Sequence, residues 1–131
     1  MAKTGSLLAA ATILVADDSA DTRAMLRNTL LSYGYRVIEA GDGREAVEVA
    51  LRECPDLVLM DLNMPVMDGL AATERIRELR ERRGNVPVVA VTAFDTYGMK
   101  EAALEVGCDA YLLKPLGLDE LESVIAGLLS I

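Results

Sequence analysis

Short apolar runs recur along the chain, and four of them are followed at once by a polar or charged residue. Four of these runs are continuous, at 12–16, 57–60, 86–91 and 110–113. Continuous apolar runs of this length are typical of parallel strands that are buried on both faces. A fifth run, at 36–39, mixes polar and apolar residues, which favours a strand nearer the edge of the sheet.

Segments with helical periodicity alternate with these runs. Asp42 and Glu45 have the spacing of a capping box, Asp68 is a suitable N-cap, and Gly34 and Gly107 are typical helix stops. The predicted helices cover 21–33, 42–54, 68–85, 95–106 and 117–129.

This alternation predicts an α/β fold with a parallel sheet, right-handed crossovers and helices on both faces. For five strands we expect the flavodoxin-like doubly wound order 2-1-3-4-5, which is taken from known proteins rather than derived from the pattern. The length of 131 residues fits one domain over 1–131, with 1–11 as a loose N-terminal tail.

The polar residues that follow the predicted strands are Asp17 with Asp18, then Asp61, Thr92 and Lys114. Sites in open α/β sheets form at the carboxyl ends of the strands, so we expect these residues to share one edge. Carboxylates gathered in one crevice repel one another unless a cation compensates them. Mg²⁺ suits such a crevice, because it prefers oxygen ligands and pairs with one or two carboxylates plus phosphate oxygens. The alternative for each aspartate alone is a helix cap or a loop residue.

Asp61 is the best candidate nucleophile, because a carboxylate can accept a phosphoryl group to give an acyl phosphate. Lys114 can offer a point charge to a phosphoryl oxygen, and Thr92 can offer a hydroxyl donor. The alternatives are structural: Lys114 in a salt bridge to Asp61, and Thr92 as a cap of the following helix.

Composition narrows the function classes. Hydrophobic residues make up 52% of the chain and charged residues 26%, as in a soluble globular protein. The net charge of −8 argues against nucleic acid as the main partner, and the Arg-rich run 74–83 is interleaved with Glu, as on a solvated helix face. The chain has no His, which excludes His-dependent nucleophile pairs and His-ligated zinc.

Cys54 and Cys108 lack a metal-binding spacing, and we expect both to be buried, reduced thiols. Lys3 and the apolar stretch 7–16 faintly resemble a signal peptide, but a tail followed by a buried strand explains them better. No stretch approaches the ~18 apolar residues of a membrane span, so we expect a cytoplasmic protein with no membrane partner.

The segment 61–69, Asp-Leu-Asn-Met-Pro-Val-Met-Asp-Gly, occurs together with Asp-Asp at 17–18, Thr-Ala at 92–93 and Lys-Pro at 114–115. In this order and spacing, the set resembles the receiver domain of the response regulators of two-component signalling, including single-domain, chemotaxis-type regulators. The resemblance covers nearly the whole chain. Each motif is weak alone, but the combination is highly specific.

For the metal, the resemblance implies Mg²⁺ bound directly by Asp18, with Asp17 assisting through water. It further implies that Asp61 is the phospho-acceptor and a metal ligand, and that Asn63 supplies a backbone carbonyl.

For the switch, the resemblance implies that Thr92 and Lys114 contact the phosphoryl group, and that Lys114–Pro115 is a cis peptide. Tyr111 matches the switch aromatic, which would turn inward and reshape the surface of 95–106, 110–113 and 117–129. The alternative for Tyr111 is a half-buried residue of an edge strand. Phe94 is a less standard position, and its ring could shield the acyl phosphate from water or simply pack within its loop.

The expected function is a phosphorelay receiver: a histidine kinase or phosphotransfer protein phosphorylates Asp61, and the altered surface binds a downstream protein. We expect a monomer or a weak phosphorylation-dependent dimer. No DNA-binding segment follows Ile131 in this sequence, so no direct transcriptional output is expected from it. The alternative is a receiver fragment of a larger hybrid kinase or regulator.

Other function classes remain as rivals. We expect no enzyme beyond self-catalysed phosphorylation and dephosphorylation, because aspartyl-nucleophile phosphatases need an acidic residue where this chain has Asn63. A flavin- or nucleotide-binding protein is the second rival, but Asp17 and Asp18 would repel the phosphate of such a ligand. A scaffold with a vestigial site is the third rival.

Overall fold

Five parallel strands form one sheet in the order β2-β1-β3-β4-β5, as predicted. The computed structural model describes residues 11–79, 86–93 and 96–129. The strands are β1 (Thr12–Ala16), β2 (Arg36–Ala40), β3 (Leu57–Asp61), β4 (Val88–Thr92) and β5 (Ala110–Leu113). β2 lies at one edge, in agreement with its mixed sequence, and β5 lies at the other.

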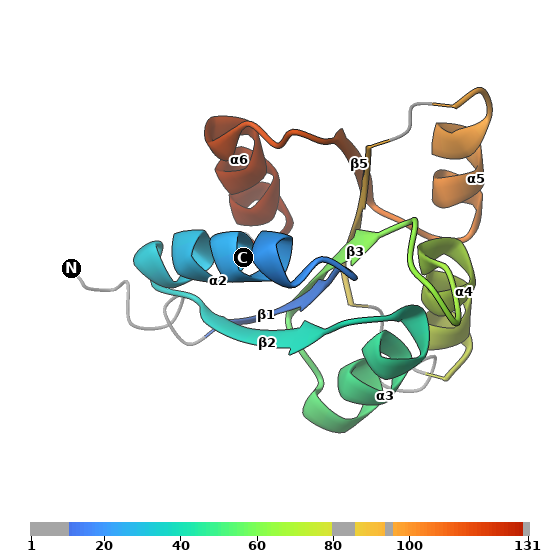
Figure 1. The fold of residues 1–131 in the computed structure, drawn as a ribbon, viewed down its shortest axis with the longest axis horizontal. Coiled ribbons are helices and arrows are strands. Elements are labelled where there is room, and N and C mark those ends of the chain that lie inside the picture. Colours follow the sequence, from blue (N-terminus) through green and yellow to red (C-terminus); the bar gives the residue numbers. More distant parts are fainter. Residues whose placement is uncertain (1–10, 80–85, 94–95, 130–131) are drawn as a thin grey trace.

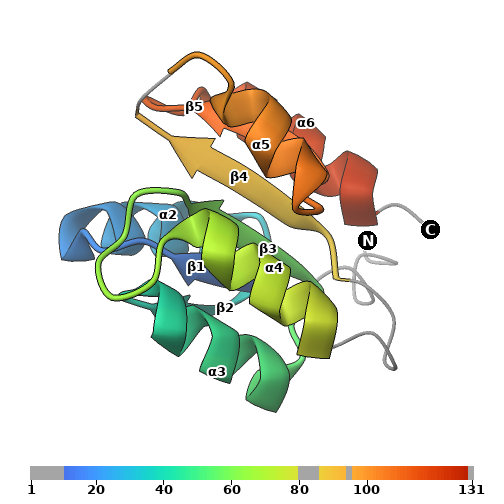
Figure 2. The ribbon, with the colours of Figure 1, turned by 90° about the vertical axis from the view of Figure 1, so that its right-hand side faces the viewer.

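Helices cover both faces of the sheet. They are α2 (Ala20–Ser32), α3 (Gly43–Glu53), α4 (Gly69–Leu79), α5 (Met99–Glu105) and α6 (Leu118–Leu129). Figure 1 shows α2 and α6 on one side of the sheet and α3, α4 and α5 on the other. Figure 2 looks onto the face covered by α3, α4 and α5. The fold is therefore the doubly wound, flavodoxin-like architecture that the alternating pattern predicts.

The apolar residues of each strand point alternately into two cores, one on each face. Ile13 and Val15 of β1 pack against Leu26 and Leu30 of α2, whereas Leu14 packs on the opposite face, against α3 and α4. The three inner strands are almost completely buried, which explains why their sequences are continuous apolar runs.

Most boundaries agree with the predictions within one or two residues. β4 begins at Val88 rather than at residue 86: Pro87 has no N–H to donate to a neighbouring strand, and the Val86 carbonyl accepts a hydrogen bond from the Arg77 side chain. α5 begins at Met99 rather than at residue 95, after Gly98 in a left-handed conformation with φ +82°. Residues 94–95 lie outside the described residues, and so does the proposed role of Phe94.

The prediction for the cysteines is half wrong. Cys108 is buried, but Cys54 is exposed. Cys54 is the C-cap residue of α3 and has a left-handed backbone, φ +47°. Both residues are present as thiols.

In the part of the chain that the structure describes, no helix has the length and apolar character needed to cross a membrane.

Candidate functional site

Asp17 follows β1 directly, and hydrogen bonds hold both its backbone and its side chain. Its N–H donates to the Ala40 carbonyl, which extends the pairing of β1 with β2 by one residue. Its Oδ1 accepts from the Ser19 N–H at 2.8 Å, at the start of α2. The side chain is buried, so its orientation is fixed at the carboxyl edge of the sheet.

Asp61, the last residue of β3, is brought beside the acidic pair after β1. The carboxylates of Asp17, Asp18 and Asp61 each offer an oxygen, and these oxygens lie within 4.8 Å of one another. Asp61 is 5% exposed, whereas Asp18 is exposed. No hydrogen bond or ion pair to the Asp18 carboxylate occurs among the described residues, so Asp18 is available to a ligand.

Lys114 reaches this cluster from the end of β5. Its Nζ lies 2.8 Å from Asp17 Oδ2 and 3.4 Å from Asp61 Oδ2. The Lys114 N–H donates to the Thr92 carbonyl, which keeps the residue in line with β4. Lys114–Pro115 is a cis peptide, as the sequence resemblance implied.

Thr92 is buried at the end of β4, and Asn63 links it to the loop after β3. Asn63 Nδ2 donates to Thr92 Oγ1 at 3.0 Å, and the Asn63 N–H donates to Asp61 Oδ1 at 3.0 Å. Asn63 therefore bridges the candidate nucleophile and the candidate hydroxyl donor. This side-chain contact was not predictable from the sequence pattern, because it depends on the conformation of a loop.

The electrostatics of the site follow from burial and from crowding of like charges. Burial raises the pKa of the Asp61 carboxyl above its usual value, and the nearby Asp17 raises it further, although Asn63 and Lys114 oppose the shift. For Lys114, burial lowers the pKa, but the hydrogen bond to Asp17 and the charges of Asp61 and Asp17 outweigh it, so its pKa is raised. Lys114 stays protonated, yet one ammonium does not compensate three carboxylates.

Two glycines let the loop after β3 and the start of α4 approach the site closely. A Cβ on Gly69 would lie 2.3 Å from the Asp61 carbonyl oxygen, and one on Gly43 would lie 1.8 Å from the Met67 carbonyl oxygen. Within the loop after β3, Val66 has φ +70°, a conformation that β-branched residues rarely adopt. The tight loop is thus built by close backbone packing, which the sequence pattern alone did not reveal.

Tyr111 lies on β5, the edge strand, and is half-buried against the core under α3, α4 and α5. Its connection to the site is its position on β5, three residues before Lys114. Its placement agrees with both roles considered for it, the switch aromatic and the edge-strand tyrosine.

The donor set fits a hard divalent cation. The three clustered carboxylates offer oxygen ligands only, and one of them, that of Asp18, is exposed to solvent and has no partner among the described residues. Burial, and after it the nearby Asp17, raise the pKa of Asp61, so its ionised form is unfavourable here and a bound cation would stabilise it. These are the residues that could hold Mg²⁺.

Known proteins are similar to this chain over most of its length. The model of the response regulator receiver domain family matches residues 13–126. Response regulator MprA of Mycobacterium leprae is 41% identical over 117 residues, which cover 89% of this chain and 50% of that protein. The chain therefore spans about half the length of the curated relatives it matches.

Solved structures share the fold over nearly the whole chain. Chemotaxis protein CheY4 of Vibrio cholerae is 31% identical with a TM-score of 0.83, covering 91% of this chain and 98% of that one. The receiver domain of sensor histidine kinase PA1611 of Pseudomonas aeruginosa PAO1 is 35% identical with a TM-score of 0.84, covering 93% and 99%. That crystal structure has a magnesium ion coordinated in the active site cleft.

A further similar structure is a complex. A chain in the co-crystal structure of the Saccharomyces cerevisiae phosphotransfer protein Ypd1 with the receiver domain of the response regulator Ssk1 is 29% identical, with a TM-score of 0.83. It covers 89% of this chain and 87% of that one.

Proposed function

Because this chain belongs to the response regulator receiver domain family of two-component signalling, we propose that it accepts a phosphoryl group on Asp61 in a Mg²⁺-dependent reaction. The observation that carries the proposal is the position of the Asp61 carboxylate. It lies within 4.8 Å of two other carboxylates and 3.4 Å from the Lys114 ammonium. A nucleophile, a place for a divalent cation and a fixed positive charge thus meet at one edge of the sheet.

In the proposed transfer, an Asp61 oxygen attacks the phosphorus of a phosphohistidine on the donor. The new O–P bond forms as the N–P bond breaks, and the imidazole leaves. Asp17, Asp18 and Asp61 would hold Mg²⁺, and the Asn63 backbone carbonyl completes the proposed ligand set. Mg²⁺ supplies charge neutralisation between the carboxylates and the phosphoryl oxygens.

Lys114 and Thr92 have complementary roles in this proposal. Lys114 Nζ already contacts Asp17 and Asp61, and it can turn to a phosphoryl oxygen without leaving the pocket. Thr92 Oγ1 is held by Asn63 before phosphorylation. Movement of the Thr92 hydroxyl toward the phosphoryl group would release that contact and change the end of β4, with Tyr111 responding on the neighbouring strand.

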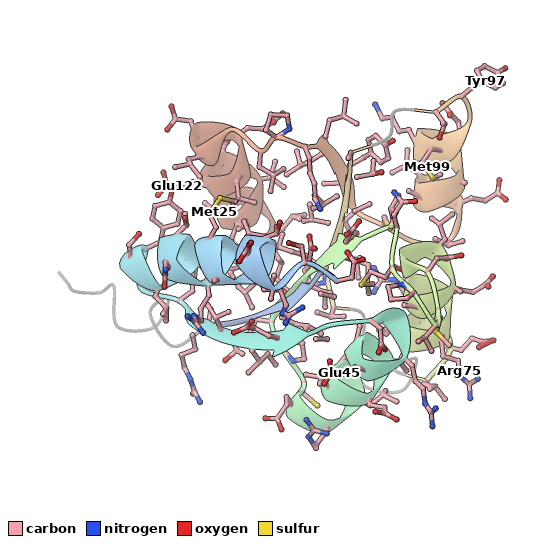
Figure 3. The ribbon with its side chains drawn as sticks, viewed as in Figure 1. Met25, Glu45, Arg75, Tyr97, Met99 and Glu122 are labelled. Carbon is pink, nitrogen blue, oxygen red and sulfur yellow. The ribbon has the colours of Figure 1, made fainter. Side chains whose placement is uncertain are left out.

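The surface that responds would be formed by α5, β5 and α6. It carries exposed apolar side chains at Tyr97, Leu104, Leu113 and Leu118. Figure 3 shows Tyr97 projecting away from the body of the protein at the start of α5. Apolar groups on an exposed surface are suited to contact with a protein partner, which supports a downstream protein target.

The proposed donor is a histidine kinase or a histidine phosphotransfer protein, and the Ypd1–Ssk1 complex supports a partner of the second kind. We place the protein in the cytoplasm, without an enzymatic activity on other substrates. Whether it works alone or as the receiver part of a longer regulator or hybrid kinase does not change the chemistry at Asp61. A phosphorylation-dependent dimer is compatible with the same surface.

The test uses a small phosphodonor such as acetyl phosphate. We expect intact-mass analysis to find one phosphoryl adduct that requires Mg²⁺ and is lost in Asp61→Asn. Asp68→Asn is the matched control. Asp68 lies in the same loop after β3 and caps α4 by accepting from the Ala71 N–H, a role that Asn fulfils equally well.

An adduct of equal yield in wild type and Asp61→Asn, or one that forms without Mg²⁺, would contradict the proposal. Loss of the adduct in Asp68→Asn would indicate that any change in this loop disables the protein, and the assignment to Asp61 would then fail.

A further inference from the structure

Arg23 of α2 lies behind the acidic pair and contacts its backbone. The guanidinium NH1 donates to the Asp17 carbonyl oxygen at 2.7 Å, and Nε forms an ion pair with Glu39 Oε1 at 3.2 Å. Its side chain is 22% exposed, and it lines a small hollow with Gly41 and Glu45. Arg23 thus ties the end of β1 to β2, although it touches none of the three clustered carboxylates.

The Asp17 carbonyl belongs to the peptide group that joins Asp17 to Asp18. A peptide group is planar, so fixing its oxygen also fixes its N–H and the direction in which the Asp18 Cα continues. This matters most for Asp18, because no hydrogen bond or ion pair of its carboxylate orients that side chain within the described residues. The position of the Asp18 carboxylate therefore depends on its backbone, and Arg23 holds that backbone.

We propose that Arg23 is a positioning residue for the divalent cation: by bonding the Asp17–Asp18 peptide group, it aims both carboxylates into the pocket beside Asp61. The inference rests on the proposed function, since it concerns the Mg²⁺ that Asp61 would share. Glu39 in turn holds Arg23 in place and neutralises its charge.

The sign of the expected effect separates positioning from plain electrostatics. Arg23 is a cation close to an acidic pocket, so its charge alone opposes the binding of another cation. If only the charge mattered, its removal would tighten Mg²⁺ binding. If Arg23 positions the ligands, its removal weakens Mg²⁺ binding despite the loss of a positive charge. Loss of such a supporting contact typically costs about 10–100-fold in metal affinity.

The experiment measures the Mg²⁺ Kd of the full chain by isothermal titration calorimetry for wild type, Arg23→Met and Arg27→Met. Methionine retains an aliphatic stem and removes all hydrogen-bond donors. Arg27 is the matched control, because it lies one turn further along α2 and pairs with the same Glu39, at 3.3 Å, without contacting Asp17. We expect Arg23→Met to bind Mg²⁺ about tenfold or more weakly, and Arg27→Met to bind as wild type or slightly more tightly.

Thermal unfolding without Mg²⁺ accompanies each titration, since a purely structural role would lower the Tm and leave Kd unchanged. Unchanged or tighter Mg²⁺ binding by Arg23→Met overturns the inference, as does equal weakening in Arg27→Met.

If Arg23→Met does not fold, Arg23→Lys replaces it. One ammonium cannot reproduce the two-sided contact with Asp17 and Glu39, so a wild-type Kd there overturns the inference. Absence of Mg²⁺ binding by wild type would instead overturn the proposed function itself.

Discussion

At the scale of single residues, the chemistry of the site is concentrated in one carboxylate, whose ionised form the fold destabilises. Asp61 is almost fully buried and faces Asp17, and within the part of the chain that the structure describes its favourable partners are the Asn63 N–H and Lys114. Its raised pKa shows that the folded protein favours the neutral acid more than the unfolded chain does. An ionised Asp61 is therefore a cost to folding that a bound cation can relieve.

A pH-dependent difference in stability follows. Without Mg²⁺, Asp61→Asn should unfold at a higher denaturant concentration than wild type at neutral pH, because the raised pKa makes ionised Asp61 destabilising. Below the usual carboxyl value of 3.8, Asp61 is protonated in both states, so the difference should vanish as the pH falls toward that value. Urea unfolding in EDTA across this range checks the prediction, and a difference that does not change with pH would contradict it.

The residues that carry reactive groups were predictable, because each ends a strand or directly follows one. Asp17, Asp61, Thr92 and Lys114 lie at the edge where the strand pattern placed them. Arg23 was not predictable, since an arginine within an amphipathic helix carries no sign of a contact with a backbone carbonyl. The same holds for the contact of Asn63 with Thr92, which requires loop geometry.

At the scale of elements, the site depends on how closely α4 approaches the end of β3. The Gly69 N–H donates to the Leu62 carbonyl, and the missing side chain of Gly69 leaves room for the Asp61 backbone. The element types and most boundaries followed from periodicity and caps, with β1 and β5 predicted to the residue. The start of α5 did not, because left-handed Gly98 sets it rather than a side-chain cap.

Substitution of two glycines should separate close packing from helix propensity. Gly69→Ala places a Cβ against backbone atoms at 2.3 and 2.8 Å, so we expect a loss of about 2–3 kcal/mol in the free energy of unfolding. Gly127→Ala, in α6, meets nothing within 4 Å and should instead gain about 0.5–1 kcal/mol. Urea denaturation of both variants measures the two effects, and a Gly69→Ala protein as stable as wild type would rule out the close approach.

At the scale of the whole molecule, cation binding and folding are linked. The acidic cluster joins residues at the ends of β1 and β3, so it exists only in the folded protein. A ligand bound to the cluster therefore stabilises the folded state. With Mg²⁺ at 100 times its Kd, the expected gain is about 2.7 kcal/mol. Differential scanning calorimetry against NaCl of equal ionic strength separates specific binding from screening.

Two aspartate variants locate this gain. Asp18→Asn removes a candidate ligand and should abolish most of the stabilisation by Mg²⁺. Asp21→Asn, in the first turn of α2 and exposed, should retain the stabilisation. An equal response of the two variants to Mg²⁺ would mean that the acidic cluster is not where the cation binds.

The salt bridge from Lys114 to Asp17 spans 97 positions of the sequence, nearly the full described length. Lys114 directly follows β5, so the complete pocket needs all five strands. A chain that stops before β5 lacks Lys114 and therefore lacks the ammonium of the pocket. The proposed phosphoryl transfer would thus be a property of the chain through β5 and not of a shorter product of translation or proteolysis.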